Sequence, residues 1–370
     1  MKAIFSVAYV AVKPEGSGRE KPAGRLAPRS GVRAEMLYSS GFSVRQYNVA
    51  LEQIYPLIGD DMRSVDRVIQ ERLHSDVALV RQVAEYLVTS GGKRMRPAVL
   101  LLAARAAGYA GRHHHELAAV VEFIHTATLL HDDVVDASDL RRGRSTANAM
   151  FGNAASVLVG DFLYSRAFQM MVSVGSMRVM EILSDATNVI AEGEVLQLMN
   201  CHDADVDVGR YLQVIRYKTA KLFEASARLG AVLGGLDKAL EDRVADYGMH
   251  LGTAFQLVDD ALDYSGDESE TGKRLGDDLA EGKPTLPLIH VMNSGSPEDA
   301  ATVRAAIESG GRETLPAIVD AVRKTGAIEF TIAQAEAEAT LASNALDALP
   351  SSHFKEALLQ LASFAVQRRY

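Results

Sequence analysis

Two aspartate clusters of identical spacing, Asp132–Asp136 and Asp259–Asp263, restrict the folds that this chain can adopt. Each cluster reads DDxxD and is embedded in an apolar run. On a helix, carboxylates four residues apart point the same way, one turn above the other. Such charges on a buried helix face repel one another and are costly to desolvate unless a cation lies between them. The pattern therefore predicts two helices whose acidic faces meet at a common cavity.

The cation that best fits this cavity is Mg²⁺, which proteins usually hold through one or two carboxylates together with substrate phosphates. A single DDxxD cluster is also compatible with a solvated acidic helix face or an incidental cation site. Two copies within apolar helices, 127 positions apart, are much harder to explain in that way. We therefore expect a Mg²⁺-diphosphate site.

Most of the chain has the apolar periodicity of α-helices. From about Val44 onward, apolar residues recur at spacings of three and four, and alternating β-branched runs are scarce. The longest predicted helices are Val77–Thr89, Glu116–Asp136, Ala154–Val174, Arg178–Met199, Tyr211–Leu233 and Ala239–Tyr264. This predicts one all-α domain, residues 46–370, in which long helices form a bundle around a central cavity.

The first 45 residues differ from the rest in composition. They carry eight Lys and Arg against three Glu, are rich in Gly, Pro and Ser, and lack a helical period. We expect residues 1–45 to be a disordered basic extension. In this interpretation the protein is cytoplasmic. Residues 1–45 are then either a bacterial extension or part of an over-long gene model whose true start is Met36. An Arg-rich, acid-poor segment is also typical of a mitochondrial transit peptide, which is the alternative.

The charge and cysteine content of the remaining chain argue against several classes of protein. Its net charge of −14 argues against nucleic acid as a partner. The single cysteine, Cys201, excludes an intrachain disulfide framework. No apolar stretch reaches the roughly 20 residues that span a bilayer, so we expect no transmembrane segment. The run His113–His115 is expected to be a solvated loop or helix start rather than a metal site.

Basic residues occur where a diphosphate would need them. Lys93 and Arg96 lie one turn apart at the start of a helix that follows two glycines, and helix N-termini favour anions. Arg141 and Arg142 follow the first aspartate cluster, and guanidinium groups bind phosphate oxygens in a bidentate manner. His125 lies two turns before Asp132 on the same face. Taken alone, each has an ordinary explanation, namely a basic helix start or a core histidine.

Lysines further along the chain could supply more positive charge to the same site. Lys218 lies in a predicted helix, whereas Lys273 and Lys283 flank the loop after the second cluster. Loop lysines usually face solvent, so each is weak evidence by itself. Together they would stabilise a departing diphosphate.

These motifs, in this order, resemble the trans-isoprenyl diphosphate synthase family, and within it the long-chain bacterial type that makes octaprenyl diphosphate. The resemblance runs from about residue 50 to the C-terminus and has no counterpart in residues 1–45. It implies the isoprenoid synthase fold, a homodimer, and Mg²⁺-dependent 1'-4 condensation of isopentenyl diphosphate with an allylic diphosphate such as farnesyl diphosphate. The matching segments are Gly91–Pro97, Phe123–Asp136, Leu140–Asn148, Phe151–Met171, Ile190–Asn200, Lys218–Ala225, Gly252–Tyr264 and Gly276–Leu288.

The resemblance also assigns roles by position. It implies that isopentenyl diphosphate is bound by Lys93, Arg96, His125 and Arg142. It implies metal ligands at Asp132 and Asp136 for the first site and at Asp259 and Asp263 for the second. The allylic diphosphate would be bound by Arg141, Lys218, Thr219, Gln256 and Lys273. Of these residues, we expect direct catalytic roles for Asp132, Asp136, Arg141, Lys218, Asp259 and Lys273.

Product length should depend on side chains below the first cluster. Short-chain relatives have bulky aromatic residues just before that cluster, whereas Ala127 and Thr128 are small, which predicts an open tunnel and a long product. Phe168, Met170 and Met171 are candidates for a deeper floor, although ordinary core packing would explain each of them. We expect octaprenyl diphosphate for a quinone (ubiquinone) side chain. Nonaprenyl (solanesyl) or shorter products are the alternatives.

Three other classes share part of this pattern. Terpene cyclases and head-to-head synthases need no isopentenyl diphosphate site, so Gly91–Pro97 and Arg142 argue against them. A non-catalytic regulatory subunit commonly lacks one aspartate cluster, and both are intact. A cation-binding scaffold would leave the basic residues unexplained.

We also expect peripheral membrane contact when the apolar product is released.

Overall fold

The computed structural model describes residues 48–89, 93–141, 143–265, 275–311 and 313–367. These residues belong to one folded unit, Arg45–Tyr370. The predicted basic extension, residues 1–45, lies outside the described residues. So do Gly91 and Gly92 and two predicted site residues, Arg142 and Lys273.

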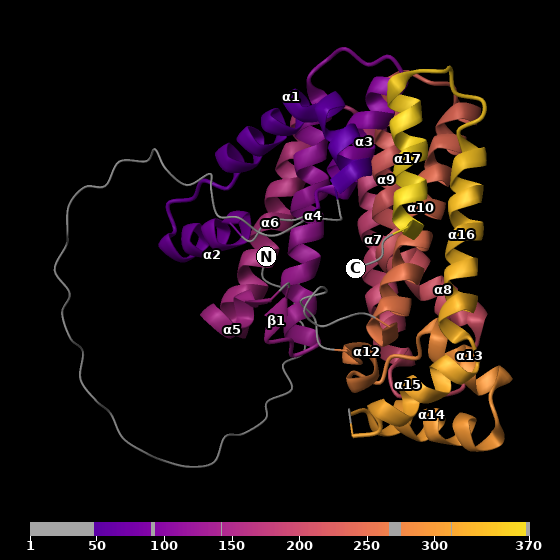
Figure 1. Ribbon diagram of the computed structural model, residues 1–370. Helices are drawn as coiled ribbons and strands as arrows, with labels where there is room; N and C mark the ends of the chain where they lie inside the picture. The colour runs from indigo at the N-terminus through magenta and orange to yellow at the C-terminus, as the bar shows by residue number, and fades with distance from the viewer. Residues whose placement is uncertain (1–47, 90–92, 142, 266–274, 312, 368–370) are drawn as a thin grey trace, which may run out of the picture. The chain divides into compact units, whose positions relative to one another are not determined.

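The described unit is built of α-helices, which confirms the predicted all-α class (Figure 1). Its first half contains α1 (Asn48–Arg72), α2 (Ala78–Thr89), α3 (Met95–Ala106), α4 (His113–Val135), α5 (Ala147–Phe151), α6 (Asn153–Ser173) and α7 (Met177–Asn200). Its second half contains α8 (Val208–Ile215), the π-helical turn η1 (Arg216–Ala220), α9 (Lys221–Leu233), α10 (Lys238–Ser265), α12 (Asp277–Ala280), α13 (Leu286–Ser294), α14 (Pro297–Ser309), α15 (Leu315–Lys324), α16 (Ala327–Ala345) and α17 (His353–Gln367). Two short antiparallel strands, β1 (Leu140–Arg141) and β2 (Arg144–Ser145), follow α4.

One predicted helix differs from the structure. The segment Tyr211–Leu233 is not a continuous α-helix, because the π-helical turn η1 separates α8 from α9. Apolar periodicity could not reveal this turn, since a π-turn adds only one residue to an otherwise regular pattern. The turn contains both Lys218 and Thr219, and π-turns are frequent at functional sites.

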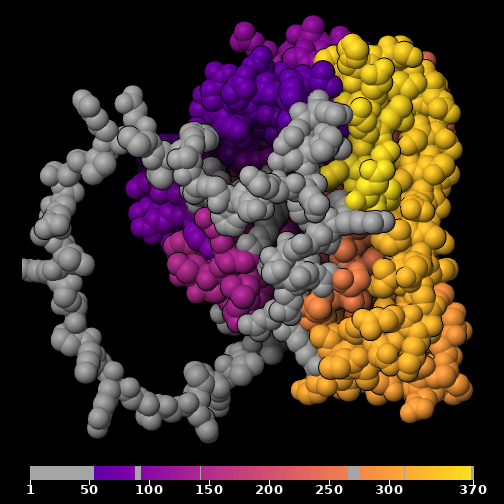
Figure 2. Space-filling model, in the orientation of Figure 1, coloured from indigo at the N-terminus to yellow at the C-terminus, as the bar shows by residue number. Residues whose placement is uncertain are grey.

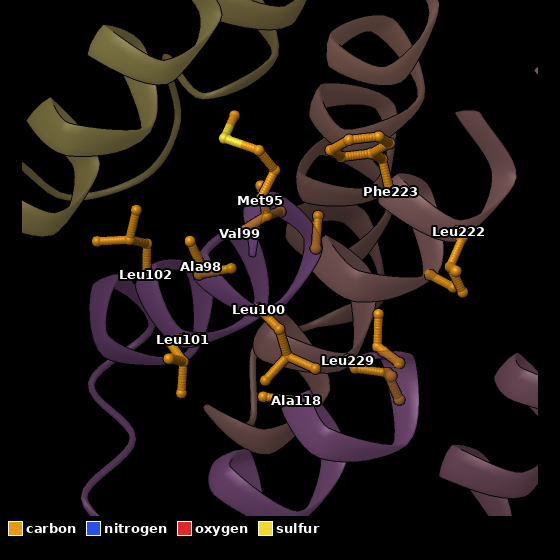
Figure 3. Close-up of a cluster of buried hydrophobic side chains, with 14 of the residues drawn as sticks. Met95, Ala98, Val99, Leu100, Leu101, Leu102, Ala118, Leu222, Phe223 and Leu229 are labelled. Carbon is orange, nitrogen blue, oxygen red and sulfur yellow. The ribbon is translucent and has the colours of Figure 1, made fainter. Parts of the chain in front are cut away.

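The main core includes residues of α3, α4 and α9, together with residues of α1, α6, α7, α10, α16 and α17. Helix α3 is apolar almost all round, as expected of a helix that is covered on every side. Figure 3 shows Leu100 of α3 beside Leu229 of α9 and Ala118 of α4, and all three belong to one buried cluster. Burying a leucine contributes about 1.5–3 kcal/mol. This packing fixes the helix that carries the first aspartate cluster.

The second aspartate cluster is carried by α10, which packs chiefly against α9 and α16. The hydroxyl of Tyr247 on α10 donates to the carbonyl oxygen of Leu358 on α17 at 2.7 Å. Figure 2 shows α16 and α17, in yellow, covering one side of the described unit. The C-terminal ends of α4 and α10 lie at the same end of the bundle, near β1 and α12 (Figure 1). Both aspartate clusters therefore lie at that end.

A buried charge cluster connects the first helices. Both carboxylate oxygens of Asp61 on α1 accept hydrogen bonds from Arg105 on α3, at 2.7 and 2.9 Å. One of these oxygens also lies 3.2 Å from His114 Nε2 and 2.8 Å from His115 Nε2 on α4. Helix α4 begins at His113 as expected, but the expectation of a solvated run is wrong for His114, which is fully buried. Arg105 already supplies the positive charge that this carboxylate needs.

This cluster should make the stability of the fold depend on pH. Burial, with the charge of His115, lowers the pKa of His114 to about 4 from an ordinary value of 6.5, and Asp61 opposes the shift. The unfolded chain therefore binds a proton here as the pH falls through 6.5, whereas the folded protein stays neutral until about pH 4. Stability is full above pH 6.5 and falls by about 2–3 kcal/mol as the pH drops to 4.

Urea unfolding at several pH values between about 4 and 8 measures this effect, with His114→Gln as the comparison. We expect the variant to lose much of the pH dependence between 6.5 and 4. Burial alone would raise the pKa of Asp61, but hydrogen bonds from Arg105 and His115 hold it well below its usual range. Asp61 therefore loses its contribution to the stability of the fold only at a pH below this window. Equal slopes for the two proteins in this window would contradict the prediction.

Helices α6 and α7 carry six large exposed apolar side chains. They are Leu158 and Val172 on α6, and Met177, Val195, Leu198 and Met199 on α7. Leu158 and Val172 are fourteen positions apart, close to four helical turns, so they share one face. In the part of the chain that the structure describes, no helix combines the length and apolarity needed to cross a membrane.

Candidate active site

The first aspartate cluster occupies the last turns of α4, and its carboxylates have different surroundings. Asp132 and Asp136 are partly exposed, whereas the middle residue, Asp133, is only 4% exposed. One Asp133 oxygen accepts from Arg141 Nε at 2.8 Å and from a terminal guanidinium nitrogen at 2.6 Å. Burial raises the pKa of Asp133, and Arg141 opposes that shift. In this structure Arg141 thus binds the middle carboxylate and leaves the outer pair accessible.

Each outer carboxylate of this cluster faces an ammonium group. Lys218 Nζ in η1 lies 3.3 Å from Asp132 Oδ2, and Lys283 Nζ lies 3.1 Å from Asp136 Oδ2. Gln197 on α7, with its amide oxygen turned toward the lysines, accepts from both at 3.3 Å. Two positive charges therefore lie beside the carboxylates at which the sequence predicts cations.

Lys218 is shared between two acidic groups. Its Nζ also lies 2.5 Å from the Glu194 carboxylate on α7. Burial raises the pKa of Glu194, although Lys218 opposes the shift. Burial alone would lower the pKa of Lys218, but Asp132 and Glu194 raise it, so the ammonium stays charged. Gly193 makes this arrangement possible, because a Cβ there would lie 2.5 Å from the Lys218 backbone nitrogen.

The second cluster has the same division between middle and outer residues. Asp260 is 3% exposed, and its carboxylate accepts from the Tyr211 hydroxyl at 2.6 Å and from the Gln256 amide at 2.7 Å. Burial, followed by the charge of Asp278, raises the pKa of Asp260. The Thr219 hydroxyl donates to the Gln256 carbonyl oxygen at 3.0 Å, so the predicted allylic residues Thr219 and Gln256 are in contact.

The outer residues of the second cluster, Asp259 and Asp263, are partly exposed. The two carboxylate oxygens of Asp263 accept backbone N–H bonds from Asp277 and Asp278, at 3.2 Å each, where α12 begins. This helix start follows the loop that contains Lys273, which lies outside the described residues. Asp263 thus has a capping role in the fold besides its predicted role as a metal ligand.

Lys283, which follows α12, has acidic neighbours from the first cluster and from its own loop. It contacts Asp136 of the first cluster and the carboxylate of Glu281 beside it. Burial alone would lower its pKa, but Asp278, Asp136 and Glu281 raise it well above its ordinary value. Asp278 also raises the pKa of Asp260 in the second cluster, so the Asp278 carboxylate influences both Lys283 and Asp260. The charges of the two clusters are therefore linked through this loop.

The predicted ligands of the second substrate are partly brought together. Arg96 on α3 lies 3.2 Å from His125 Nε2 on α4, and its guanidinium lies over the Phe223 ring at 4.4 Å. Lys93 is exposed, and its carbonyl oxygen accepts from the Tyr55 hydroxyl. Arg142, the fourth predicted ligand, lies outside the described residues. The structure thus joins α3 and α4 at this point through Arg96 and His125.

A cavity of about 110 Å³ lies beside α4, on the side of Arg141. Its walls combine apolar residues of α1, α2, α4 and α6 with a polar group. The polar side chains include Arg94, Glu122, His125, Asp133, Arg141 and Arg144. The positive charges at this cavity and the neighbouring Arg96 form an environment suited to a second anionic group.

The predicted chain-length residues all lie in packed parts of the bundle. Ala127 is fully buried in a cluster with residues of α2, α5 and α6, whereas Thr128 is half-buried one turn before Asp132. Phe168 packs against the main core, and Met171 is fully buried within it, as is Met170. Of the two small residues, Thr128 is on the face of α4 that carries Asp132.

Among the site residues that were not singled out from the sequence are Glu194, Gln197 and Tyr211. The spacing of Glu194 and Gln197 on a predicted helix gave a weak signal, because polar residues three apart are common on solvated helix faces. Tyr211 gave none, since a tyrosine at helical spacing is usually core. Their roles depend on lysine and aspartate partners from other helices.

An all-α bundle that brings two DDxxD clusters and several Lys and Arg side chains to one end defines a class of protein. It is an enzyme class that binds diphosphate substrates with the help of divalent cations.

Comparison with known proteins identifies the family. The profile of the family described as Polyprenyl synthetase matches residues 77–323. Octaprenyl diphosphate synthase of Escherichia coli is 56% identical over 86% of this chain and 99% of its own length. A nonaprenyl diphosphate synthase of Rhodobacter capsulatus that is specific for geranyl diphosphate is 44% identical, over 86% and 98%.

A solved structure gives the same result. A polyprenyl synthase from Caulobacter crescentus, complexed with calcium and isoprenyl diphosphate, superimposes with a TM-score of 0.84. It is 46% identical and covers 88% of this chain and 100% of its own. The chain belongs to the polyprenyl synthetase family. It is a prenyltransferase that makes long-chain trans-polyprenyl diphosphates, which confirms the predicted fold, family and reaction.

Proposed function

We propose that the product is octaprenyl diphosphate, made by successive 1'-4 condensation of isopentenyl diphosphate onto an allylic primer such as farnesyl diphosphate. The observation that carries the diphosphate chemistry is the pair of lysines, Lys218 and Lys283, placed against Asp132 and Asp136. The octaprenyl length is supported by the identity to the Escherichia coli enzyme. The Rhodobacter capsulatus relative keeps nonaprenyl as the nearest alternative.

The acidic residues fit Mg²⁺, the proposed cofactor. Asp132, Asp136, Asp259 and Asp263 would hold it, since hard cations prefer carboxylate oxygens. Two ammonium groups lie beside the first cluster, and their presence supports a cation site at this position. When bound, Mg²⁺ would neutralise the diphosphate oxygens and so make the diphosphate a better leaving group.

The surrounding side chains would bind and orient the allylic diphosphate. Lys218 and Lys283 would turn from the carboxylates toward the diphosphate oxygens, together with Arg141 and Lys273. Thr219 and Gln256 are held in contact by a 3.0 Å hydrogen bond and would orient the same group. These donors stabilise negative charge as it develops on the leaving diphosphate. The apolar helices around the site exclude water that would otherwise quench the allylic cation.

We propose that isopentenyl diphosphate is bound by Lys93, Arg96, His125 and Arg142. The contact between Arg96 and His125 supports a shared anion site. A substrate anchored there would present its double bond to the allylic carbon near the aspartates. The new bond leaves a cation that loses a proton, and we assign the departed diphosphate as the acceptor. The grown chain then extends along α4, away from the aspartates.

We further propose a homodimer in the cytoplasm. The apolar faces of α6 and α7, with Leu158, Val172, Val195, Leu198 and Met199 exposed, would be covered by a second copy. The apolar product would be handed over at a membrane surface, where it supplies a quinone side chain. Sedimentation of the purified protein tests the dimer.

The central experiment is an elongation assay. We expect purified protein to convert farnesyl diphosphate and labelled isopentenyl diphosphate with Mg²⁺ into octaprenyl diphosphate, identified by chromatography. Excess EDTA should abolish product, and restored Mg²⁺ should recover it, because the diphosphate leaves only when its charge is neutralised. Product without isopentenyl diphosphate would indicate a cyclase or head-to-head synthase. No elongation by the protein alone would indicate a regulatory subunit and overturn the proposal.

A further inference from the structure

Backbone strain in the described residues coincides with the site. Three residues other than glycine have a positive φ: Arg94 (48°), Ala137 (48°) and His202 (62°). Arg94 lies within the predicted Lys93–Arg96 motif, and Ala137 directly follows Asp136. Such conformations cost about 1–3 kcal/mol and persist when surrounding structure holds them, often at functional sites. His202, just after α7, belongs to no predicted motif and requires a separate explanation.

Three contacts hold His202 in place. Its backbone N–H donates to the Gly282 carbonyl oxygen at 2.8 Å. Its ring Nδ1 lies 3.0 Å from the carbonyl oxygen of Ile307 on α14, and because a carbonyl can only accept, Nδ1 carries the proton. The ring also lies against two glycines. A Cβ on Gly282 would lie 2.3 Å from Nδ1, and one on Gly310 would lie 3.0 Å from Cε1.

These contacts connect α7 to the loop that carries Lys283. Gly282, which has a φ of 68° and accepts from His202, directly precedes Lys283. The Lys283 ammonium in turn lies 3.1 Å from Asp136. His202 therefore fixes the backbone one residue from a lysine whose side chain must reach the first cluster. We propose that His202 is a positioning residue that holds Lys283 at the diphosphate site.

The inference rests on the proposed role of Lys283 in binding the allylic diphosphate. A long, flexible lysine side chain loses much conformational freedom when its ammonium is fixed in one place. Tethering the preceding backbone reduces the disorder that binding must remove, so the lysine is pre-organised for its ligand. Loss of the tether should weaken binding of the allylic substrate. It should have little effect on isopentenyl diphosphate, whose predicted ligands are other residues: Lys93, Arg96, His125 and Arg142.

Substitutions of His202 distinguish the contribution of its ring from that of its strained backbone. His202→Ala removes the ring and keeps the strain, whereas His202→Gly removes both. His202→Asn keeps a side-chain donor, and asparagine tolerates positive φ. We expect KM for farnesyl diphosphate to rise about tenfold in the alanine and glycine variants. The asparagine variant should stay within about threefold of the unchanged protein, and KM for isopentenyl diphosphate should change little in all three.

A matched control is available in His290 on α13. Its Nε2 lies 3.3 Å from the Thr325 carbonyl oxygen, and its ring stacks on Phe330 at 4.3 Å. His290→Ala therefore removes the same kind of tether without touching a proposed site residue. We expect it to lower the melting temperature and leave both KM values unchanged.

A double-mutant cycle with Lys283→Ala tests whether His202 acts through Lys283. If His202 acts through Lys283, then the combined His202→Ala and Lys283→Ala variant has the same KM for farnesyl diphosphate as Lys283→Ala alone. Additive increases, or His202 variants that behave like His290→Ala, would overturn the positioning role. If Lys283→Ala itself leaves KM and kcat unchanged, the proposed diphosphate role of Lys283 fails instead.

Discussion

Asp132→Asn is expected to lower kcat by about a thousandfold, equivalent to about 4 kcal/mol of transition-state stabilisation, while leaving the fold nearly as stable as before. Asparagine keeps the shape of the side chain but removes the negative charge that a divalent cation needs. Asp132 is partly exposed, and its partner Lys218 keeps Glu194 as a second partner. Little of the folding free energy should therefore depend on it. Initial rates of elongation at saturating substrates, with melting temperatures of both proteins, measure the two effects.

The middle residue of the same cluster provides a contrasting control. Asp133 is buried and accepts two hydrogen bonds from Arg141, whose side chain is 32% exposed. Asp133→Asn should reduce the free energy of unfolding by about 2 kcal/mol, less than for a fully buried ion pair because water reaches the arginine. Substitution of these neighbouring aspartates would thus have different effects, a loss of kcat for Asp132 and a loss of stability for Asp133. An Asp132→Asn protein with more than a tenth of the original kcat would contradict the metal-ligand role.

The second large effect concerns product length. Thr128→Tyr is expected to shorten the product by several isoprene units with kcat for the first condensation largely retained. Thr128 is half-buried one turn before Asp132 on the same face of α4. A helical turn is about 5.4 Å, comparable with one isoprene unit, so a ring at this depth blocks growth soon after the metal site. Chromatography of the dephosphorylated products measures chain length.

Ala127→Tyr tests the neighbouring position, and Thr128→Ser is the matched small variant. Ala127 is fully buried against α2, α5 and α6, so a tyrosine there must displace packed side chains. We expect a shorter product from Ala127→Tyr as well, accompanied by a stability loss of about 1–3 kcal/mol from overpacking. Thr128→Ser should retain the original length. Unchanged products from both tyrosine variants would refute the open tunnel below the first cluster.

Most of the helices and site residues that could be predicted were recognised from local sequence patterns. Apolar residues at spacings of three and four repeat over many turns, so the positions of α4, α6, α7 and α10 followed from periodicity. The aspartate clusters were recognisable because charge is rare inside apolar runs. The one-residue insertion at η1 had no such signal, although it places both Lys218 and Thr219 in the site. Gly193 on α7 lies close to the backbone of this turn, and periodicity within one segment cannot record such a contact between separate helices.

Residue type and local spacing were enough to predict an all-helical fold, the two acidic clusters and the basic residues available to them. Which carboxylate faces which cation depends instead on how the helices pack against one another. This packing pairs Asp133 with Arg141 and Asp260 with Tyr211, and it leaves Asp132 and Asp136 facing Lys218 and Lys283. Those pairs join residues far apart in the chain, and burial fixes their energies. Spacing along one helix placed the two outer aspartates of each cluster on one face, but it could not identify the partner of each carboxylate.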